Sequence, residues 1–205
     1  MKLSRVPVAA ALLAFSLVAA GGEPLEKKDD PQNRFEPRSA PGAGQKFLQK
    51  FVGEWDVVKT FHPRTGAPVA VKGECRQTMI HNGRFLQSDF VFGQGDSKTT
   101  GLGIIGFDTD SGKFTSMWTD SRSTRMSLRH SRDPFKGDEI VLYSQSLDDG
   151  KKDARRSRTV TRLEDESKKI VHRQYALEAE GKERLVMELV LTRKSETPKK
   201  TDRKE

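Results

Sequence analysis

The chain has 205 residues, of which 34% are hydrophobic and 32% are charged, and its formal net charge at pH 7 is +8. This length supports one domain of about 150 residues, and the high charged fraction indicates that part of the chain stays solvated. A single cysteine, Cys75, excludes a scaffold held by internal disulfides, and its strand context predicts a small buried residue rather than a reactive thiol.

Residues 1–20 have the pattern of a secretory signal peptide. Lys2 and Arg5 precede an apolar run at residues 8–17, and small residues follow at positions 18–20. The run is too short to span a bilayer of about 30 Å, and no cysteine follows the cleavage point to carry a lipid. We therefore expect cleavage before Gly21 and a periplasmic or secreted protein whose mature form has no transmembrane anchor. An uncleaved membrane anchor is the alternative.

Residues 21–44 are rich in proline, glycine and charge, and are predicted to form a disordered linker. The folded domain is expected at residues 45–194, and a disordered charged tail at residues 195–205. At the start of the domain, Phe47, Leu48 and Phe51 share one side of two helical turns. This spacing predicts a short amphipathic helix over residues 45–51, which Gly53 ends.

Short alternating segments separated by turn residues fill the rest of the domain. Ten strands are predicted, at residues 54–62, 69–80, 84–92, 99–108, 113–120, 123–131, 139–147, 156–163, 169–177 and 183–193. The pair Asn82 and Gly83 is typical of a type I′ hairpin turn. Because closure removes exposed sheet edges, we expect an all-β, antiparallel up-and-down barrel. An open two-layer sandwich is the alternative, since the sequence does not show whether the first and last strands pair.

The stretch GLGIIG at residues 101–106 matches the G-x-G-x-x-G spacing of dinucleotide-binding enzymes, and Asp120 follows at about the distance of a ribose-binding carboxylate. Such a site needs a helix to begin at the third glycine, so that its N-terminus holds the pyrophosphate. Here Gly106 is followed by turn residues and another strand pattern. We therefore interpret the motif as part of a strand, in which Gly101 and Gly103 let a side chain or a ligand approach closely or ease a bend.

The same region carries a family resemblance. The runs GLGIIGFD (101–108), SGKF (111–114) and WTDS (118–121) resemble the central signature of the domain of unknown function 1579 family. GEW (53–55), NGRFL (82–86), VMEL (186–189) and TRK (192–194) agree with it, so the resemblance covers about residues 45–194. It implies a lipocalin-like barrel of the calycin kind, and no reaction, substrate or catalytic residue. Where the family pattern has an apolar aromatic residue this chain has His172, which implies a more polar interior.

Alternation along the predicted strands separates an inner from an outer face. The inward set that combines apolar walls with polar groups is typical of a small-molecule site, and its candidate residues are Trp55, Trp118, Asp120, His172, Gln174 and Met187. A filled core without a cavity is the alternative. On the strand at 123–131, Met126 and Leu128 are expected to point inward while Arg125 and Arg129 join a basic outer stripe.

These features are compatible with three alternative functions. In the first, the protein is a non-enzymatic exported barrel that binds a small, partly apolar ligand. The second is an enzyme acting through Asp120 and His172, and the third is an interaction module that uses the basic outer face and tail. The histidines lack metal-ligand spacing and no nucleophile motif occurs, so we predict no metal, cofactor or catalytic site and no specific nucleic-acid binding. A lone haem ligand at His172 is a further alternative.

Overall fold

The computed structural model describes residues 32, 35–36, 39–145 and 156–195. The chain divides into two units, residues 1–38 and 39–205, and the account below concerns the second. The predicted signal peptide, most of the predicted linker and nearly all of the predicted tail lie outside the described residues. No helix within these ranges has the length and apolar character needed to cross a bilayer.

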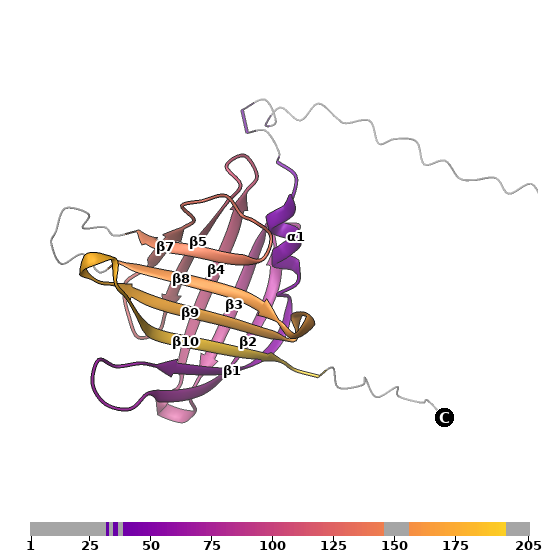
Figure 1. Ribbon diagram of the computed structural model, residues 1–205. Helices are drawn as coiled ribbons and strands as arrows, with labels where there is room; N and C mark the ends of the chain where they lie inside the picture. Colours follow the sequence, from indigo (N-terminus) through magenta and orange to yellow (C-terminus); the bar gives the residue numbers. More distant parts are fainter. Residues whose placement is uncertain (1–31, 33–34, 37–38, 146–155, 196–205) are drawn as a thin grey trace, which may run out of the picture. The chain divides into compact units, whose positions relative to one another are not determined.

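One helix and ten antiparallel strands make up the described part of the second unit (Figure 1). They are α1 (Ala43–Gln49), β1 (Gly53–Phe61), β2 (Val69–Ile80), β3 (Phe85–Phe92), β4 (Thr99–Asp108), β5 (Lys113–Asp120), β6 (Ser127–His130), β7 (Glu139–Gln145), β8 (Ser157–Glu164), β9 (Lys169–Leu177) and β10 (Glu183–Arg193). Short 3-10 turns lie at Gly95–Ser97, Asp165–Ser167 and Ala179–Gly181. The helix begins two residues before the predicted domain boundary.

The sheet closes on itself. Each strand pairs with its neighbour in sequence, and β1 pairs with β10 from Trp55 opposite Arg193 to Phe61 opposite Met187. The predicted up-and-down barrel is therefore confirmed, and the open sandwich is wrong. Closure leaves neither β1 nor β10 as a free edge that another chain could extend.

Two connections differ from the predicted ones. The hairpin at Asn82 and Gly83 is present, but its loop spans four residues, because Ile80 pairs with Phe85 and the Arg84 N–H donates to the Ile80 carbonyl at 3.1 Å. Strand β6 begins at Ser127 rather than at residue 123. The backbone before it is held in a turn, where the Arg125 N–H donates to Ser123 Oγ at 3.1 Å.

Helix α1 lies across one end of the barrel, which we call the helix end (Figure 1). Gln45 ties the helix to the end of β4, because its Nε2 donates to the Phe107 carbonyl at 2.8 Å. Phe47 packs against the rings of Phe51 and Phe135, at 5.4 and 4.9 Å between centroids. This aromatic cluster closes the helix end with buried apolar surface, the main source of folding free energy.

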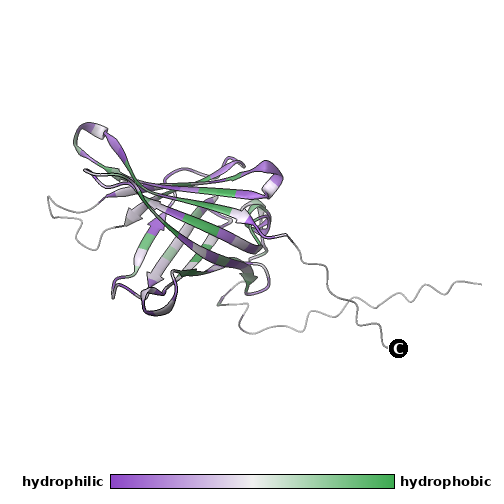
Figure 2. Cartoon of the chain, turned by 90° about the horizontal axis from the view of Figure 1, so that it is seen from below, coloured by the Kyte–Doolittle hydropathy of each residue, from purple (hydrophilic) through white to green (hydrophobic). Residues whose placement is uncertain are grey.

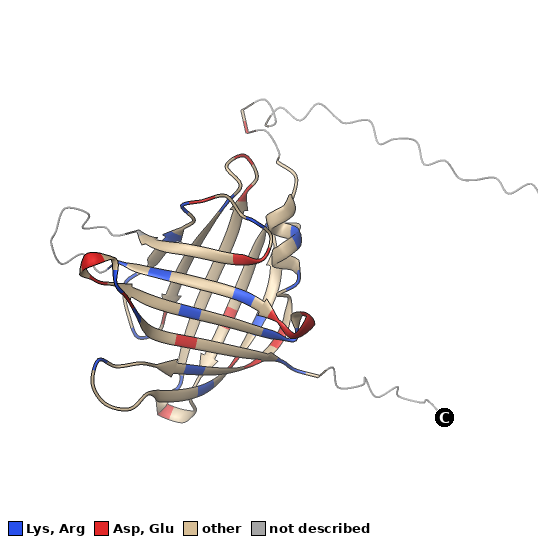
Figure 3. Cartoon of the chain, in the orientation of Figure 1, with Lys and Arg blue, Asp and Glu red and all other residues tan. Residues whose placement is uncertain are grey.

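Hydrophobic and hydrophilic residues alternate along the strands, as Figure 2 shows, so one face of the sheet turns inward. On the outside of β8, β9 and β10, basic and acidic residues lie among one another (Figure 3). Arg158 pairs with Glu183, Arg162 with Glu139 and Arg173 with Glu188. These three arginines are thus compensated, two of them by glutamates of β10 and Arg162 by Glu139 of β7. The outer stripe predicted at Arg125 and Arg129 is not formed, because Arg129 lines the interior.

Candidate functional site

The barrel encloses a cavity of about 430 Å³ that lies between the helix end and the opposite end, which we call the loop end. Its apolar wall includes Leu86, Phe90, Phe92, Ile105, Trp118, Met187, Leu189 and Leu191. Its polar lining consists of Lys59, Gln77, Ser88, Ser116, Asp120, Arg122, Arg129, Thr159, Thr161, His172 and Gln174. The barrel is therefore hollow, and the filled-core alternative is wrong.

Five of the six residues proposed from the sequence line this cavity, namely Trp118, Asp120, His172, Gln174 and Met187. Trp55 does not. It is fully buried, its Nε1–H donates to the Phe51 carbonyl at 3.0 Å, and the Arg193 guanidinium lies 4.1 Å from the centroid of its ring. Trp55 faces inward as predicted, but it belongs to the packed core near the start of β1. Its assignment to the site is corrected accordingly.

Two aromatic rings explain the first and the third glycine of the motif. Gly101 and Gly103 lie beneath the indole of Trp118: a Cβ at Gly101 would overlap that ring, and one at Gly103 would come within 3.4 Å of it. A Cβ at Gly106 would come within 2.7 Å of the Phe85 ring. All three glycines belong to β4, and the chain continues through a hairpin into β5. The strand interpretation is confirmed, with the close approach made by Trp118.

Trp118 and Asp120 form one fixed pair at the loop end. The Trp118 Nε1–H donates to Asp120 Oδ2 at 3.1 Å, and the Arg122 N–H donates to Asp120 Oδ1 at 2.9 Å. Burial raises the pKa of Asp120, but these two hydrogen bonds and the charges of Arg122 and Lys59 outweigh it and lower the pKa overall. Asp120 is therefore an ionised acceptor that orients the indole.

Lys59 is a cation on the inner wall that sequence reasoning missed. Its Nζ lies 4.3 Å from the centroid of the Phe92 ring and 5.1 Å from that of Phe61, so two aromatic faces hold the ammonium group. Burial and the charge of Arg122 lower the pKa of Lys59, while Asp120 partly opposes them. Lys59 occupies an inward position of β1, where its apolar stem follows the wall.

His172 lies in the middle of β9 and is held by Thr161 on the neighbouring strand β8. Its Nδ1 lies 2.7 Å from Thr161 Oγ1. Burial, followed by the positive charge of Arg129, lowers the pKa of His172 to about 4. The imidazole is thus neutral at pH 7. His172 and Asp120 line the same cavity, and no hydrogen bond or ion pair in the described ranges joins them.

Arg129 is the largest departure from the sequence analysis. It lines the cavity instead of the outer face, whereas Met126 and Leu128 are 49% and 37% exposed. Arg129 stands opposite Ser116 of β5, which also faces inward, so the pairing sets its direction. Its Nε is buried without a hydrogen-bond partner. The alternation of apolar and polar residues predicted the wrong inward face for β6. Its inward residues, Ser127 and Arg129, are both polar, whereas the pattern assigned the apolar residues to the interior.

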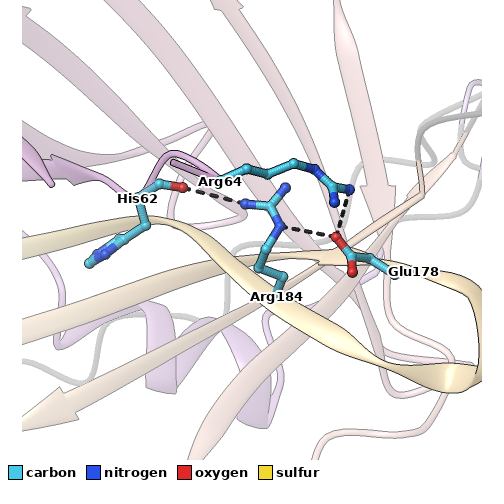
Figure 4. A network of polar contacts seen from close by, with 4 residues as sticks. All are labelled: His62, Arg64, Glu178 and Arg184. Atoms are coloured by element: carbon cyan, nitrogen blue, oxygen red, sulfur yellow. Dashed lines mark hydrogen bonds and ion pairs between the residues drawn. The ribbon is translucent and has the colours of Figure 1, made fainter. Parts of the chain in front are cut away.

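The loop end is tied together by the network in Figure 4. Glu178 accepts hydrogen bonds from Arg64 at 2.8 Å and from Arg184 at 3.0 Å, and Arg184 also donates to the His62 carbonyl at 3.4 Å. The contacts join the β1–β2 loop to the turn between β9 and β10. They support the rim beside Phe61 and Met187, which line the cavity.

Neither metal-binding geometry nor a reactive thiol is found in the part of the chain that the structure describes. No group of three His, Cys, Asp or Glu side chains there is placed to hold a metal ion. Cys75 is buried as predicted, and burial raises the pKa of its thiol, with a further contribution from Asp89. A thiol with a raised pKa is a poor nucleophile, so Cys75 acts as a packing residue.

Comparison with known proteins agrees with the fold. The computed structure is similar to the crystal structure of Rv2717c from M. tuberculosis, with a TM-score of 0.53 and 12% identity over 77% of this chain and 100% of that chain. It is also similar to the S-type phycobiliprotein lyase CPES from Guillardia theta, with a TM-score of 0.50 and 11% identity over 80% of this chain and 98% of that chain. At such identities the likeness concerns the lipocalin-like barrel alone.

The sequence comparisons point to one family. No curated protein matches the sequence. Residues 40–193 match the family described as "Protein of unknown function (DUF1579)", and this range contains the glycine motif, both tryptophans and every residue that lines the cavity. The chain therefore belongs to the DUF1579 family.

Proposed function

We propose that this protein binds a small, partly apolar molecule inside its barrel. The observation that carries the proposal is the cavity of about 430 Å³, whose aromatic and aliphatic walls hold a limited set of polar groups. Ligand sites in proteins typically have about 300–1,000 Å³ and this mixture of apolar surface with a few orienting polar groups. The ligand is expected to contact Trp118, Met187 and the polar residues Asp120, His172 and Gln174.

We also propose that the protein meets its ligand after export. The basic start, apolar run and small residues of positions 1–20 support this, because they have the order of a cleavable signal. Mass spectrometry of the protein recovered from outside the cytoplasm of its host is expected to show Gly21 as the first residue. Recovery there with Met1 retained would contradict cleavage.

Ligand binding is tested by tryptophan emission. In a Trp55→Phe variant, Trp118 is the sole tryptophan, so emission reports on the cavity wall alone. Titration with the uncharged apolar probe N-phenyl-1-naphthylamine is expected to change this emission in a saturable manner with one site per chain. The complementary Trp118→Phe variant, which keeps only the core residue Trp55, is expected to show a much smaller change. Emission that never saturates in the Trp55→Phe variant would refute binding within the barrel.

A further inference from the structure

The interior of the barrel has an excess of positive charge. The charged residues that line the cavity are Lys59, Arg122 and Arg129 against Asp120 alone. His172 does not change this balance at pH 7, because its lowered pKa leaves it neutral. Like charges that line a cleft raise the local concentration of a counter-ion, so this excess favours an anionic guest over a neutral one of the same shape.

Arg129 differs from the arginines on the outer face of the barrel in having no ionic partner. Those on the outer face, Arg158, Arg162 and Arg173, are each paired with a glutamate. Arg129 has no ion pair and no side-chain hydrogen bond to any described residue, and its Nε is buried. Leaving this buried N–H of a charged group without an acceptor costs free energy. Arg129 therefore places a buried charged donor, its Nε–H, on the cavity wall, where no described residue accepts from it.

The neighbours of Arg129 are neutral. Across the sheet it stands opposite Ser116 of β5 and Ser144 of β7, and Ser144 Oγ already accepts the Ser157 N–H at 2.8 Å. His172 lies close enough for the charge of Arg129 to lower its pKa, and Thr161 holds that ring in place. No acidic side chain among the described residues offsets the burial of Arg129. The described residues thus supply no acceptor for the buried Nε–H of Arg129, and a ligand in the cavity can supply one.

The apolar half of the site lies on β3 and β5. Phe90 packs edge-on against Trp118 at 5.5 Å and lies parallel to Phe92 at 5.8 Å between centroids. These rings and Met187 form a wall without charge, on the same cavity as Arg129. A molecule that satisfies both halves needs an apolar body and one anionic group that accepts two parallel hydrogen bonds, which is the geometry of a carboxylate on arginine.

We propose that Arg129 binds the carboxylate of an amphipathic organic acid whose apolar body packs against Phe90, Phe92 and Trp118. This inference rests on the proposed ligand-binding function and names the class of ligand. Two neutral residues near Arg129 line the same cavity, namely Ser116 and His172. They supply further hydrogen bonds to the carboxylate oxygens. Lys59 and Arg122 at the loop end attract the acid towards the cavity.

The test compares decanoate with 1-decanol, which share an apolar body and differ in the anionic group. Their binding is measured at neutral pH by displacement of N-phenyl-1-naphthylamine. In the wild-type protein decanoate is expected to bind at least tenfold more tightly than 1-decanol. The Arg129→Met variant is expected to lose this preference and to keep its affinity for 1-decanol and for the probe. The matched control Arg125→Met, at an exposed position outside the cavity, is expected to keep the preference.

Each outcome separates the inference from the function on which it rests. If the uncharged probe does not bind the wild-type protein, the proposed function fails. If the probe binds but decanoate and 1-decanol bind equally, or if Arg129→Met keeps the preference, the inference fails alone. If Lys59→Met lost as much of the preference for decanoate over 1-decanol as Arg129→Met does, the assignment of the carboxylate to Arg129 would be overturned. Should Arg129→Met not fold, Arg129→Lys, which keeps the charge without the planar group, is expected to show a reduced but measurable preference.

Discussion

A single residue, Arg129, shows how the site differs from the rest of the barrel. A guanidinium whose Nε–H is buried without a partner lowers the stability of the ligand-free protein, because the hydration of that N–H is lost without compensation. Arg129→Met is therefore expected to raise the free energy of unfolding by about 1 kcal/mol in the absence of ligand. Urea unfolding measures this as a higher midpoint with an unchanged slope. A lower midpoint would show that Arg129 supports the fold instead of a guest.

His172 makes stability depend on pH. Its folded-state pKa of about 4 lies below its ordinary value of 6.5, so between these values the unfolded chain binds more protons than the folded one. Stability from this residue is complete above pH 6.5 and decreases as pH falls towards 4, by up to about 3 kcal/mol. The groups facing His172 are Thr161 and Arg129, and Leu189 stands opposite it on β10.

His172→Leu is expected to flatten this pH dependence, because the substituted residue does not titrate. Melting temperatures measured at intervals from pH 4 to pH 7 compare the two proteins, and the informative quantity is the slope. Equal slopes in wild type and variant would show that His172 does not carry the effect.

At the scale of residues, polar side chains of the cavity were predictable where they continue a series of inward-facing apolar residues. Asp120 continues the inward series of Phe114, Ser116 and Trp118, and the structure places it on the cavity wall. Lys59 and Arg129 were missed because a hydropathy pattern assigns charged residues to the solvent face. Which way they point depends on the pairing of their strands, and that information is not local in sequence.

At the scale of elements, β4 and β5 form a matched pair, with small residues on one strand and a large ring on the other. Gly101→Ala is expected to push the Trp118 ring away from β4 and to break its hydrogen bond to Asp120. The expected loss of stability is about 1–3 kcal/mol, as for other overpacked sites. Chemical unfolding, followed by tryptophan emission, measures both effects.

Gly103→Ala is the control for that variant. A methyl group there meets the ring at an ordinary contact distance of 3.4 Å, and alanine is favoured over glycine within a strand. Stability is expected to stay the same or to rise by up to about 1 kcal/mol. Equal losses in Gly101→Ala and Gly103→Ala would mean that close contact with Trp118 is not the reason for the first glycine.

Most strands were predictable from alternation and turn residues. Strands β2, β4, β5, β9 and β10 have the predicted bounds, because each is long and is flanked by a clear turn. Strand β6 was predicted to begin too early, since residues 123–126 continue the alternating pattern but bond locally in a turn. The length of the loop at Asn82 was also predicted wrongly. Positive φ at His81 extends the turn beyond the two residues of a type I′ hairpin.

At the scale of the whole domain, the packed core and the cavity lie in different parts of the barrel. The aromatic cluster and Trp55 pack near the helix end, while the cavity opens between them and the loop end. Closure was predictable because ten strands without covering helices need protected edges. The size of the cavity was not predictable, since it depends on how far the side chains from all the strands reach across the interior.

The central claim, that a ligand occupies this interior, is tested most directly by filling it. Ser116→Phe places a ring on the cavity wall beside Arg129, whereas Thr115→Phe adds the same ring to the neighbouring, exposed position of β5. Calorimetric titration with N-phenyl-1-naphthylamine is the measurement, with folding of both variants verified by circular dichroism. Binding is expected to weaken at least tenfold in Ser116→Phe and to stay at the wild-type value in Thr115→Phe. Wild-type affinity in a folded Ser116→Phe protein would contradict the account, because the probe would then bind outside the barrel.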